Sequence, residues 1–453
     1  MQIDICGCPI SLQSNEALEA WNGVVLAILS HGRTAPVHLG KLLELEPEFA
    51  MGHAIKGLAT LMLARRELVS VAEDANRQAQ LCLGRGGATQ RERLWCRALD
   101  SWLAGNPEQS IAAMEDAVAL RQGDTISMKL SHGIRFMLGD HRGMLRAVKA
   151  VIGAHGEDHP LRGYALGCLA FAQEENGLYR EAERSGLQAL DYAKDDAWGL
   201  HAVAHVYDMT HRTECGIKLI DSNVAAWDHC NNFRFHVWWH KALLLLDQRD
   251  YGAVLDLYDR QIRSEKTDDY RDFSNASSLL VRLELDGVNV GDRWAELADL
   301  AEARVADGCL VFADLHYMLA LVGDKRDTAT EAMIARVAQS AQGTDSNALI
   351  MRDPGQAAAR GLASFGEGQY DVAFANLAAA QPKFQIMGGS HAQRDVFERL
   401  TIEAGIRAGQ LDAASGLLQQ RIDQRAGEQD RFASSRLQMI ADSRLAQAQF
   451  AAE

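Results

Sequence analysis

The feature that most constrains the fold is a unit of two helix-forming stretches joined by a short turn. The clearest copy covers residues 163–196, where Leu166 belongs to the first stretch and Gly177 to the turn. In the second stretch, small residues such as Ala182 and Gly186 allow the two helices to cross closely. The pattern predicts a pair of antiparallel helices in about 34 residues.

The unit recurs with drifting spacing, which is typical of a divergent repeat array. The glycines of two successive turns, Gly105 and Gly139, lie 34 residues apart. We therefore expect an all-α protein, a tetratricopeptide-repeat α-solenoid forming a curved or closed superhelix of antiparallel helix pairs. A single continuous domain should cover residues 1–453, with possible irregular connections at 263–278 and 340–355. The weaker copies are 94–120, 126–152, 237–262 and 357–382.

Composition excludes several classes of protein. The chain has 46 Lys and Arg against 61 Asp and Glu, a net charge of −15, which argues against nucleic-acid binding. No run approaches the roughly 20 apolar residues of a membrane span, and the first residues lack the apolar core of a signal peptide. The eight cysteines include no C-x-x-C pair. We expect a cytoplasmic protein with reduced thiols and no membrane partner.

Histidines are concentrated in one part of the chain, since six of the 15 fall between residues 201 and 240. At about 100° per residue, a helix places Trp198, His201, His205 and Asp208 on one face. His236 and His240 form a second pair one helical turn apart, with Trp239 between them in sequence. The first helices of tetratricopeptide units line the inner surface, so both faces should look into a groove.

Two later segments carry similar residue types. Asp314 and His316 lie in one apolar stretch, where Asp314 is either a helix N-cap or a partner of His316. In the other segment, Ser390 and Gln393 have the spacing of a capping box, which places His391, Arg394 and Asp395 in the first turns of a helix. The arginines Arg85, Arg91, Arg93 and Arg97 are expected on a solvated face.

Several sequence blocks together resemble the tetratricopeptide repeat protein 38 family over essentially the full length. The resemblance implies a helical-repeat fold with a closed or strongly curved solenoid, and it supplies no reaction. The chain departs from the family pattern at Val237, Asn275 and Ala313. The family-pattern positions are His201, His205, His240, His316, Arg394 and Asp395. The matching blocks are Pro9–Ser11, Ser14–Ala17, Phe49–His53, Asp196–His205, Val237–His240, Asn275–Leu280, Phe312–His316 and Ala392–Phe397.

The favoured functional hypothesis is an enzyme of hydrolase or lyase type whose groove holds a small polar, possibly anionic molecule. Its cofactor would be none or a divalent metal ion, because histidine serves as acid, base and metal ligand near neutral pH. The candidate catalytic residues are His201, His205, His240, Asp208, His316 and Asp395. The candidate substrate-binding residues are Trp198, His236, Trp239, His391, Arg394, Glu174 and Glu175. The candidate metal ligands are His201, His205 and His240.

Other interpretations fit the same pattern. A pair of histidines four residues apart also occurs on exposed faces and as satisfied core groups, and Ala202 stands where a zincin motif has glutamate. The alternative function is a non-catalytic repeat scaffold that binds a peptide or protein partner in the groove. A solenoid has exposed ends, so a homodimer is possible.

Overall fold

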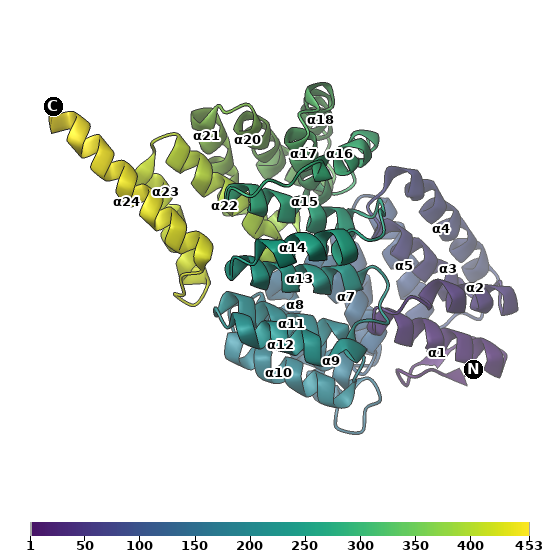
Figure 1. Cartoon of the computed structure of the whole chain (residues 1–453). Helices are drawn as coiled ribbons and strands as arrows, with labels where there is room; N and C mark the ends of the chain where they lie inside the picture. Colours follow the sequence, from purple (N-terminus) through teal and green to yellow (C-terminus); the bar gives the residue numbers. More distant parts are fainter. Residues whose placement is uncertain (1, 453) are drawn as a thin grey trace. The chain divides into compact units, whose positions relative to one another are not determined.

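The computed structural model describes residues 2–452, and its helices follow one another along the chain as antiparallel pairs (Figure 1). The small strands β1 (Gln2–Ile3) and β2 (Pro9–Ile10) pair with each other in an antiparallel ladder. The prediction of an all-α repeat fold is therefore confirmed. Within residues 2–452, no helix has both the length and the apolar composition of a membrane span.

The chain divides into two compact units, and the division falls inside one helix. Unit 1 runs to Val203 and includes Ile220–Arg234, while unit 2 comprises Ala204–Leu219 and the chain from Phe235 onward. Helix α11 (Ala197–Met209) thus contributes its first half to unit 1 and its second half to unit 2.

Unit 1 is built on five helix pairs and the beginning of α11. Its N-terminal segment is held by Arg91, which is buried and forms ion pairs of 2.6 Å with both Asp4 and Asp124. The expectation of a solvated face was wrong for Arg91, because its partners lie far away in the sequence. The helices are α1 (Asn15–Leu29), α2 (Ala35–Leu45), α3 (Ala50–Leu61), α4 (Val69–Gly84), α5 (Gln90–Leu103), α6 (Pro107–Leu120), α7 (Thr125–Met137), α8 (His141–Val151), α9 (Arg162–Glu174) and α10 (Tyr179–Tyr192), with the short helices η1 (Arg66–Leu68), η2 (Ile152–Ala154) and η3 (Val224–Ala226).

Unit 2 contains the remaining helices, and its C-terminal helices return to its first ones. Asp208 of α11 forms an ion pair of 2.9 Å with Arg425, and Asp247 of α13 accepts a hydrogen bond of 2.7 Å from the backbone N–H of Arg431. The helices are α12 (Thr213–Ser222, which ends in unit 1), α13 (Phe233–Asp247, whose first two residues belong to unit 1), α14 (Tyr251–Leu257), α15 (Tyr270–Leu285), α16 (Arg293–Ala303), α17 (Val311–Gly323), α18 (Asp327–Ser340), α19 (Ser346–Ile350), α20 (Gln356–Gly366), α21 (Tyr370–Ala380), α22 (His391–Arg407), α23 (Leu411–Gln424) and α24 (Arg431–Ala452), with η4 (Tyr258–Ile262), η5 (Met351–Gly355) and η6 (Gln381–Met387).

The turns between paired helices follow the sequence pattern. Gly105, Gly139 and Gly177 have φ angles of +80°, +67° and +74°, a region that glycine adopts without steric cost. The segment 263–278 is non-helical only from 263 to 269, because α15 begins at Tyr270. The segment 340–355 contains α19 and the π-helical η5.

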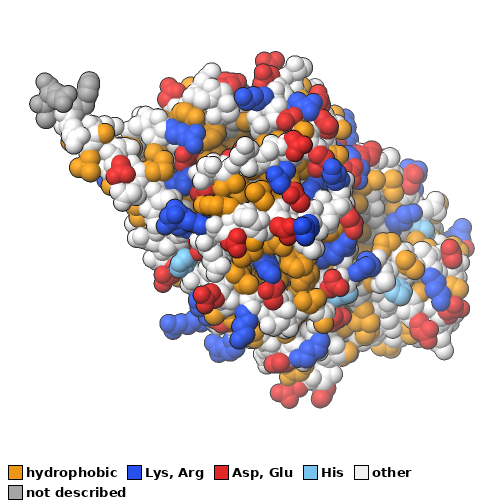
Figure 2. All heavy atoms as spheres, viewed as in Figure 1, with side chains coloured by type: hydrophobic (Ala, Val, Ile, Leu, Met, Phe, Trp, Pro, Cys, Tyr) orange, Lys and Arg blue, Asp and Glu red, His pale blue; other side chains and the backbone are white. Residues whose placement is uncertain are grey.

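Charged side chains of both signs share the molecular surface. On the face in Figure 2, Lys and Arg side chains are interspersed with Asp and Glu side chains. Mixed charge of this kind does not provide the basic surface that phosphate backbones require.

The close helix crossing at Gly186 gives a first prediction. A Cβ atom there would lie 2.5 Å from Cγ2 of Val203 and 2.9 Å from the carbonyl oxygen of Gly199. Gly186→Ala should therefore lower the free energy of unfolding by about 1–3 kcal/mol through overpacking. The matched control is Gly40→Ala in α2, where no heavy atom lies within 4 Å of the new methyl group and helix propensity adds up to about 1 kcal/mol. Urea denaturation that gives equal stability for the two variants would contradict the close crossing.

Candidate functional site

The first half of α11 places Trp198 and His201 in an aromatic cluster of unit 1. The Phe171 ring centroid lies 4.4 Å from that of Trp198 and 5.4 Å from that of His201. The Phe233 ring lies 5.7 and 5.3 Å from the same two rings. Because Trp198 is 8% and His201 2% exposed, this part of the face does not look into an open groove as expected. It packs into the core of unit 1.

Buried polar groups that the sequence did not reveal surround Trp198. Its indole N–H donates to Nε2 of His132 at 3.3 Å, and Nζ of Lys129 lies 4.4 Å from its ring centroid. Burial holds the pKa of His132 well below its ordinary value. Burial also raises the pKa of Asp196 to about 7, although Lys129 opposes this shift. The only sequence signal for these buried polar groups was Lys129, a charged residue on the mostly buried helix α7.

Glu174 and Glu175 lie at the end of α9 in unit 1. Both side chains are inaccessible, and Glu175 Oε2 lies 3.0 Å from Nδ1 of His141. Glu175 therefore has a partner within its own unit, on the neighbouring helix α8.

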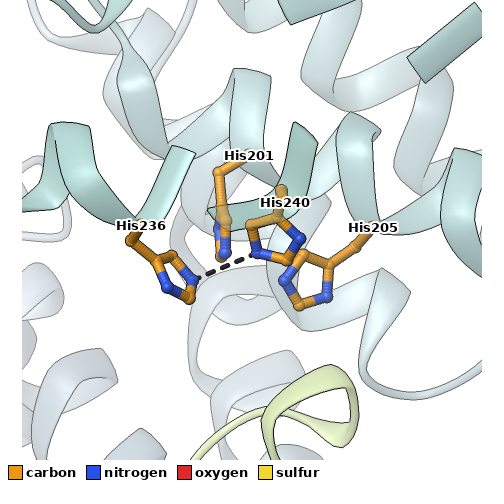
Figure 3. A group of neighbouring side chains, drawn as sticks. All are labelled: His201, His205, His236 and His240. Atoms are coloured by element: carbon orange, nitrogen blue, oxygen red, sulfur yellow. Dashed lines mark hydrogen bonds between the residues drawn. The ribbon is translucent and has the colours of Figure 1, made fainter. Parts of the chain in front are cut away.

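Three histidines predicted from the sequence come together in unit 2. His205 lies on α11, and His236 and His240 lie one turn apart on α13. The Nε2 atoms of His236 and His240 are 3.1 Å apart, and the rings of His205 and His240 are 4.4 Å apart between centroids (Figure 3). One ring nitrogen of each of the three lies within 4.8 Å of the others. His201, also drawn in Figure 3, precedes His205 by one turn of α11.

The imidazoles of α13 are neutral near neutral pH. Burial lowers the pKa of His236 to about 3, against a smaller opposite effect of its hydrogen bond to Asn275. Burial also lowers the pKa of His240 well below its ordinary value, and the neighbouring His205 acts in the same direction. A neutral imidazole offers one N–H and one lone pair.

The capping box predicted for α22 is confirmed, because Ser390 and Gln393 bond each other's backbone N–H groups. It places His391 in the first turn, 5.3 Å from the ring of His205. Arg394 is buried and its guanidinium donates to the carbonyl oxygen of Gly389.

Asp395 is the centre of an ion-pair network. Its carboxylate accepts hydrogen bonds of 2.6 Å from both Arg399 and Arg421, and Nη2 of Arg282 lies 3.5 Å away. Burial alone would raise the pKa of Asp395, but the arginines hold it well below its ordinary value. Arg282 behaves differently, because burial lowers its pKa to about 9, although Asp395 and Asp208 oppose this shift. Asp395 is therefore ionised at neutral pH, and its carboxylate oxygens are occupied by arginine side chains.

The carboxylate of Asp208 is likewise held in an ion pair with an arginine. Arg425 donates to Oδ1 of Asp208 at 2.9 Å and to its backbone carbonyl oxygen at 2.8 Å. Beside this pair is a cavity of about 20 Å³, lined among others by Arg282, Asp395 and Asp430. That volume is enough for about one water molecule.

His316 and Trp239 complete the predicted residues. Nδ1 of His316 donates to the carbonyl oxygen of Phe312 at 2.7 Å, and burial lowers the pKa of His316 to about 3. The Trp239 ring stacks on that of His236, with centroids 5.1 Å apart. Asp314 is neither an N-cap nor a partner of His316, since Leu310 occupies the N-cap position of α17 and Asp314 pairs with Arg336 at 2.6 Å.

A groove that the sequence did not indicate lies in unit 1 between α6, α7 and α8. Its volume is about 390 Å³, within the range of ligand-binding pockets. The lining is Glu115, Val118, Ala119, Gln122, Met128, Ser131, Arg135, Gly143, Arg146, Ala147, Ala150 and Val151.

No family model matches the chain. Among solved structures, it is similar to one chain in the structure of Naa15/Naa10 bound to HypK-THB, at 12% sequence identity and a TM-score of 0.25. The match covers 95% of this chain and 66% of the other, so this chain spans just under two thirds of that protein. A likeness at this level says nothing about activity. The helices and their pairing define a helical-repeat protein.

The Asp395 network gives a prediction about stability. Asp395→Asn removes the charge that Arg399 and Arg421 share, so it should lower the free energy of unfolding by about 3–5 kcal/mol. The control is Asp412→Asn, which breaks an exposed pair with Arg444 and should cost about 1 kcal/mol or less. If urea denaturation gave equal losses of unfolding free energy for the two variants, the Asp395 network would contribute no more stability than an exposed ion pair.

The burial of neutral His316 gives a prediction about pH. Below about pH 6.5 His316 takes up a proton in the unfolded chain, whereas in the folded chain it stays neutral until about pH 3. The contribution of neutral His316 to the free energy of unfolding is therefore lost as the pH falls through that window. Near pH 5 the loss should reach about 2 kcal/mol. The drop in unfolding free energy between about pH 7.5 and about pH 5, measured with chelator present, should therefore be about 2 kcal/mol smaller in His316→Leu. An unchanged drop would mean that His316 is not buried as a neutral ring.

Proposed function

We propose that the chain is a non-catalytic helical-repeat scaffold that binds a peptide segment of a partner protein in the groove between α6, α7 and α8. The observation that carries this proposal is the groove itself, because it combines an apolar floor, open volume and a charged rim. Repeat proteins commonly recognise extended or helical segments through such surfaces.

The surroundings of Asp208 and Asp395 in unit 2 favour a scaffold over a hydrolase or lyase. Acid–base catalysis requires a group that reaches the substrate, yet Asp208 and Asp395 are both held in arginine ion pairs. The adjoining cavity of about 20 Å³ is far smaller than the several hundred Å³ of a typical substrate pocket.

The groove lining indicates the chemistry of the peptide. Val118, Met128 and Val151 give it a buried apolar floor, which suits an aliphatic side chain. At the rim, Arg135 is already paired with Glu115. Arg146 is exposed and has no ion pair with any residue in the described range 2–452. The peptide that fits is therefore an aliphatic segment with a carboxylate placed to meet Arg146.

Membership of the tetratricopeptide repeat protein 38 family is part of this proposal. It rests on the sequence blocks that carry the resemblance, such as Asp196–His205 and Phe312–His316. A cytoplasmic location and a homodimer also remain predictions.

Selection from a random-peptide display library tests the proposal. Peptides enriched on the wild-type chain should combine aliphatic residues with Asp or Glu. Their affinity, measured by fluorescence anisotropy, should fall about tenfold or more in Ala147→Trp, which fills the groove, and in Arg146→Glu, which repels the carboxylate.

The matched control is Arg142→Glu, an exposed position on the same helix α8 that does not line the groove. It makes the same charge change as Arg146→Glu and should leave affinity nearly unchanged. The proposal is wrong if no peptide is enriched, or if the enriched peptides bind Ala147→Trp as tightly as the wild type.

A further inference from the structure

The three histidines of unit 2 have the spacing of ligands to a single ion. When two imidazoles bind one zinc ion at about 2.0–2.1 Å in tetrahedral geometry, their nitrogens lie about 3.3 Å apart. The Nε2 atoms of His236 and His240 are 3.1 Å apart, and one ring nitrogen of His205 lies within 4.8 Å of one ring nitrogen of each of the other two. The His236–His240 pair is already near this spacing, and a movement of the His205 ring by at most about 1.5 Å would bring the third nitrogen to the same ion.

A hydrogen bond that His236 donates to a residue outside the cluster sets the orientation of its ring. Its Nδ1–H donates to the amide oxygen of Asn275 at 2.8 Å, so in the neutral ring Nε2 carries the lone pair. That lone pair points toward His240. Metal-binding histidines characteristically donate their other ring N–H to an oxygen acceptor in this way.

The same hydrogen bond argues against an anion at this position. Nε2 of His236 has no proton to donate, and a metal-free His240 would give its own Nε2–H to His236 across the 3.1 Å gap. An anion requires donors, whereas these two facing atoms supply at most one proton, which they share. A cation needs lone pairs, which His236 offers at Nε2 and which His240 offers there in its other neutral tautomer.

The donor set narrows the choice of cation. Three imidazole nitrogen donors suit zinc, cobalt, nickel or copper, whereas calcium and magnesium prefer oxygen ligands. Arg282, whose guanidinium carbon lies 5.7 Å from the Trp239 ring centroid, brings a positive charge near the cluster and weakens the binding of any cation. Asp395 partly offsets that charge.

We infer that His205, His236 and His240 form a binding site for a divalent transition-metal ion, zinc being the best match, and that Asn275 is the positioning residue for His236. The site is separate from the groove of unit 1 and does not depend on the proposed function. Oxygen ligands such as water would complete the coordination.

Cobalt titration of the untagged full-length chain, stripped with chelator, tests the site. One Co²⁺ per chain should bind and give the visible absorption bands of cobalt with nitrogen ligands, and Zn²⁺ should displace it. Metal content after purification, read by elemental mass spectrometry, should approach one zinc per chain. The inference is wrong if the wild-type chain shows no cobalt bands on titration and contains no bound metal after purification. Stabilisation by inorganic phosphate without any metal effect would indicate an anion site instead.

Variants separate ligands from neighbours. His240→Ala and His236→Ala should abolish the cobalt bands, while Asn275→Ala should retain them with an affinity about 10–100-fold weaker. Asn275→Asp, which keeps an oxygen acceptor, should restore the affinity. The matched control is His316→Ala, a buried histidine of the same unit outside the donor set, which should bind like the wild type. Circular dichroism of each metal-free variant checks folding. Undiminished cobalt binding by His240→Ala would overturn the ligand assignment, and undiminished affinity of Asn275→Ala would overturn the positioning role.

Discussion

The ion pairs around Asp395 are the interaction on which unit 2 depends. Asp395 lies on α22 and binds Arg282 of α15 and Arg421 of α23, so a single carboxylate joins three helices. Arg421 continues the network to Asp430, at 2.6 Å, just before α24. Removing these charges from water is costly, and the cost is recovered only while every charge keeps its partner. The network therefore makes the return of the C-terminal helices an all-or-none contact, unlike the gradual stacking of an open repeat array.

This closure explains why the predicted catalytic carboxylates are unavailable to a ligand. Asp208 and Asp395 have the residue type and helical position of acid–base groups, but their arginine partners lie elsewhere in the chain. Arg425 follows Asp208 by 217 residues, and no periodicity in a single sequence connects two such positions. Local patterns carry no information about long-range pairs that form only when the unit closes.

Local features, in contrast, could be predicted well. The helix pairs follow from small residues at crossings and glycines at turns, and the capping box at Ser390 follows from a spacing of three residues. For the histidine face of α11, the sequence predicts which residues share the face but not what packs against it. Helical geometry places Trp198 and His205 on one face, but it does not tell which neighbours cover that face. The helix is buried nearly all round, so its apolar stripe could not distinguish a groove from a core.

Burial of the histidines changes the meaning of the cluster. A catalytic histidine must be reached by a substrate and must exchange protons near neutral pH, and the ring of His240, 2% exposed and with its pKa held well below its ordinary value by burial, does neither. A metal ligand has the opposite requirements: it must be neutral, oriented and held still. The hydrogen bond that His236 donates to Asn275 and the stacking of Trp239 on His236 supply orientation, and burial keeps the rings of His236 and His240 neutral. The properties that count against acid–base catalysis are thus the ones that an ion-binding centre needs.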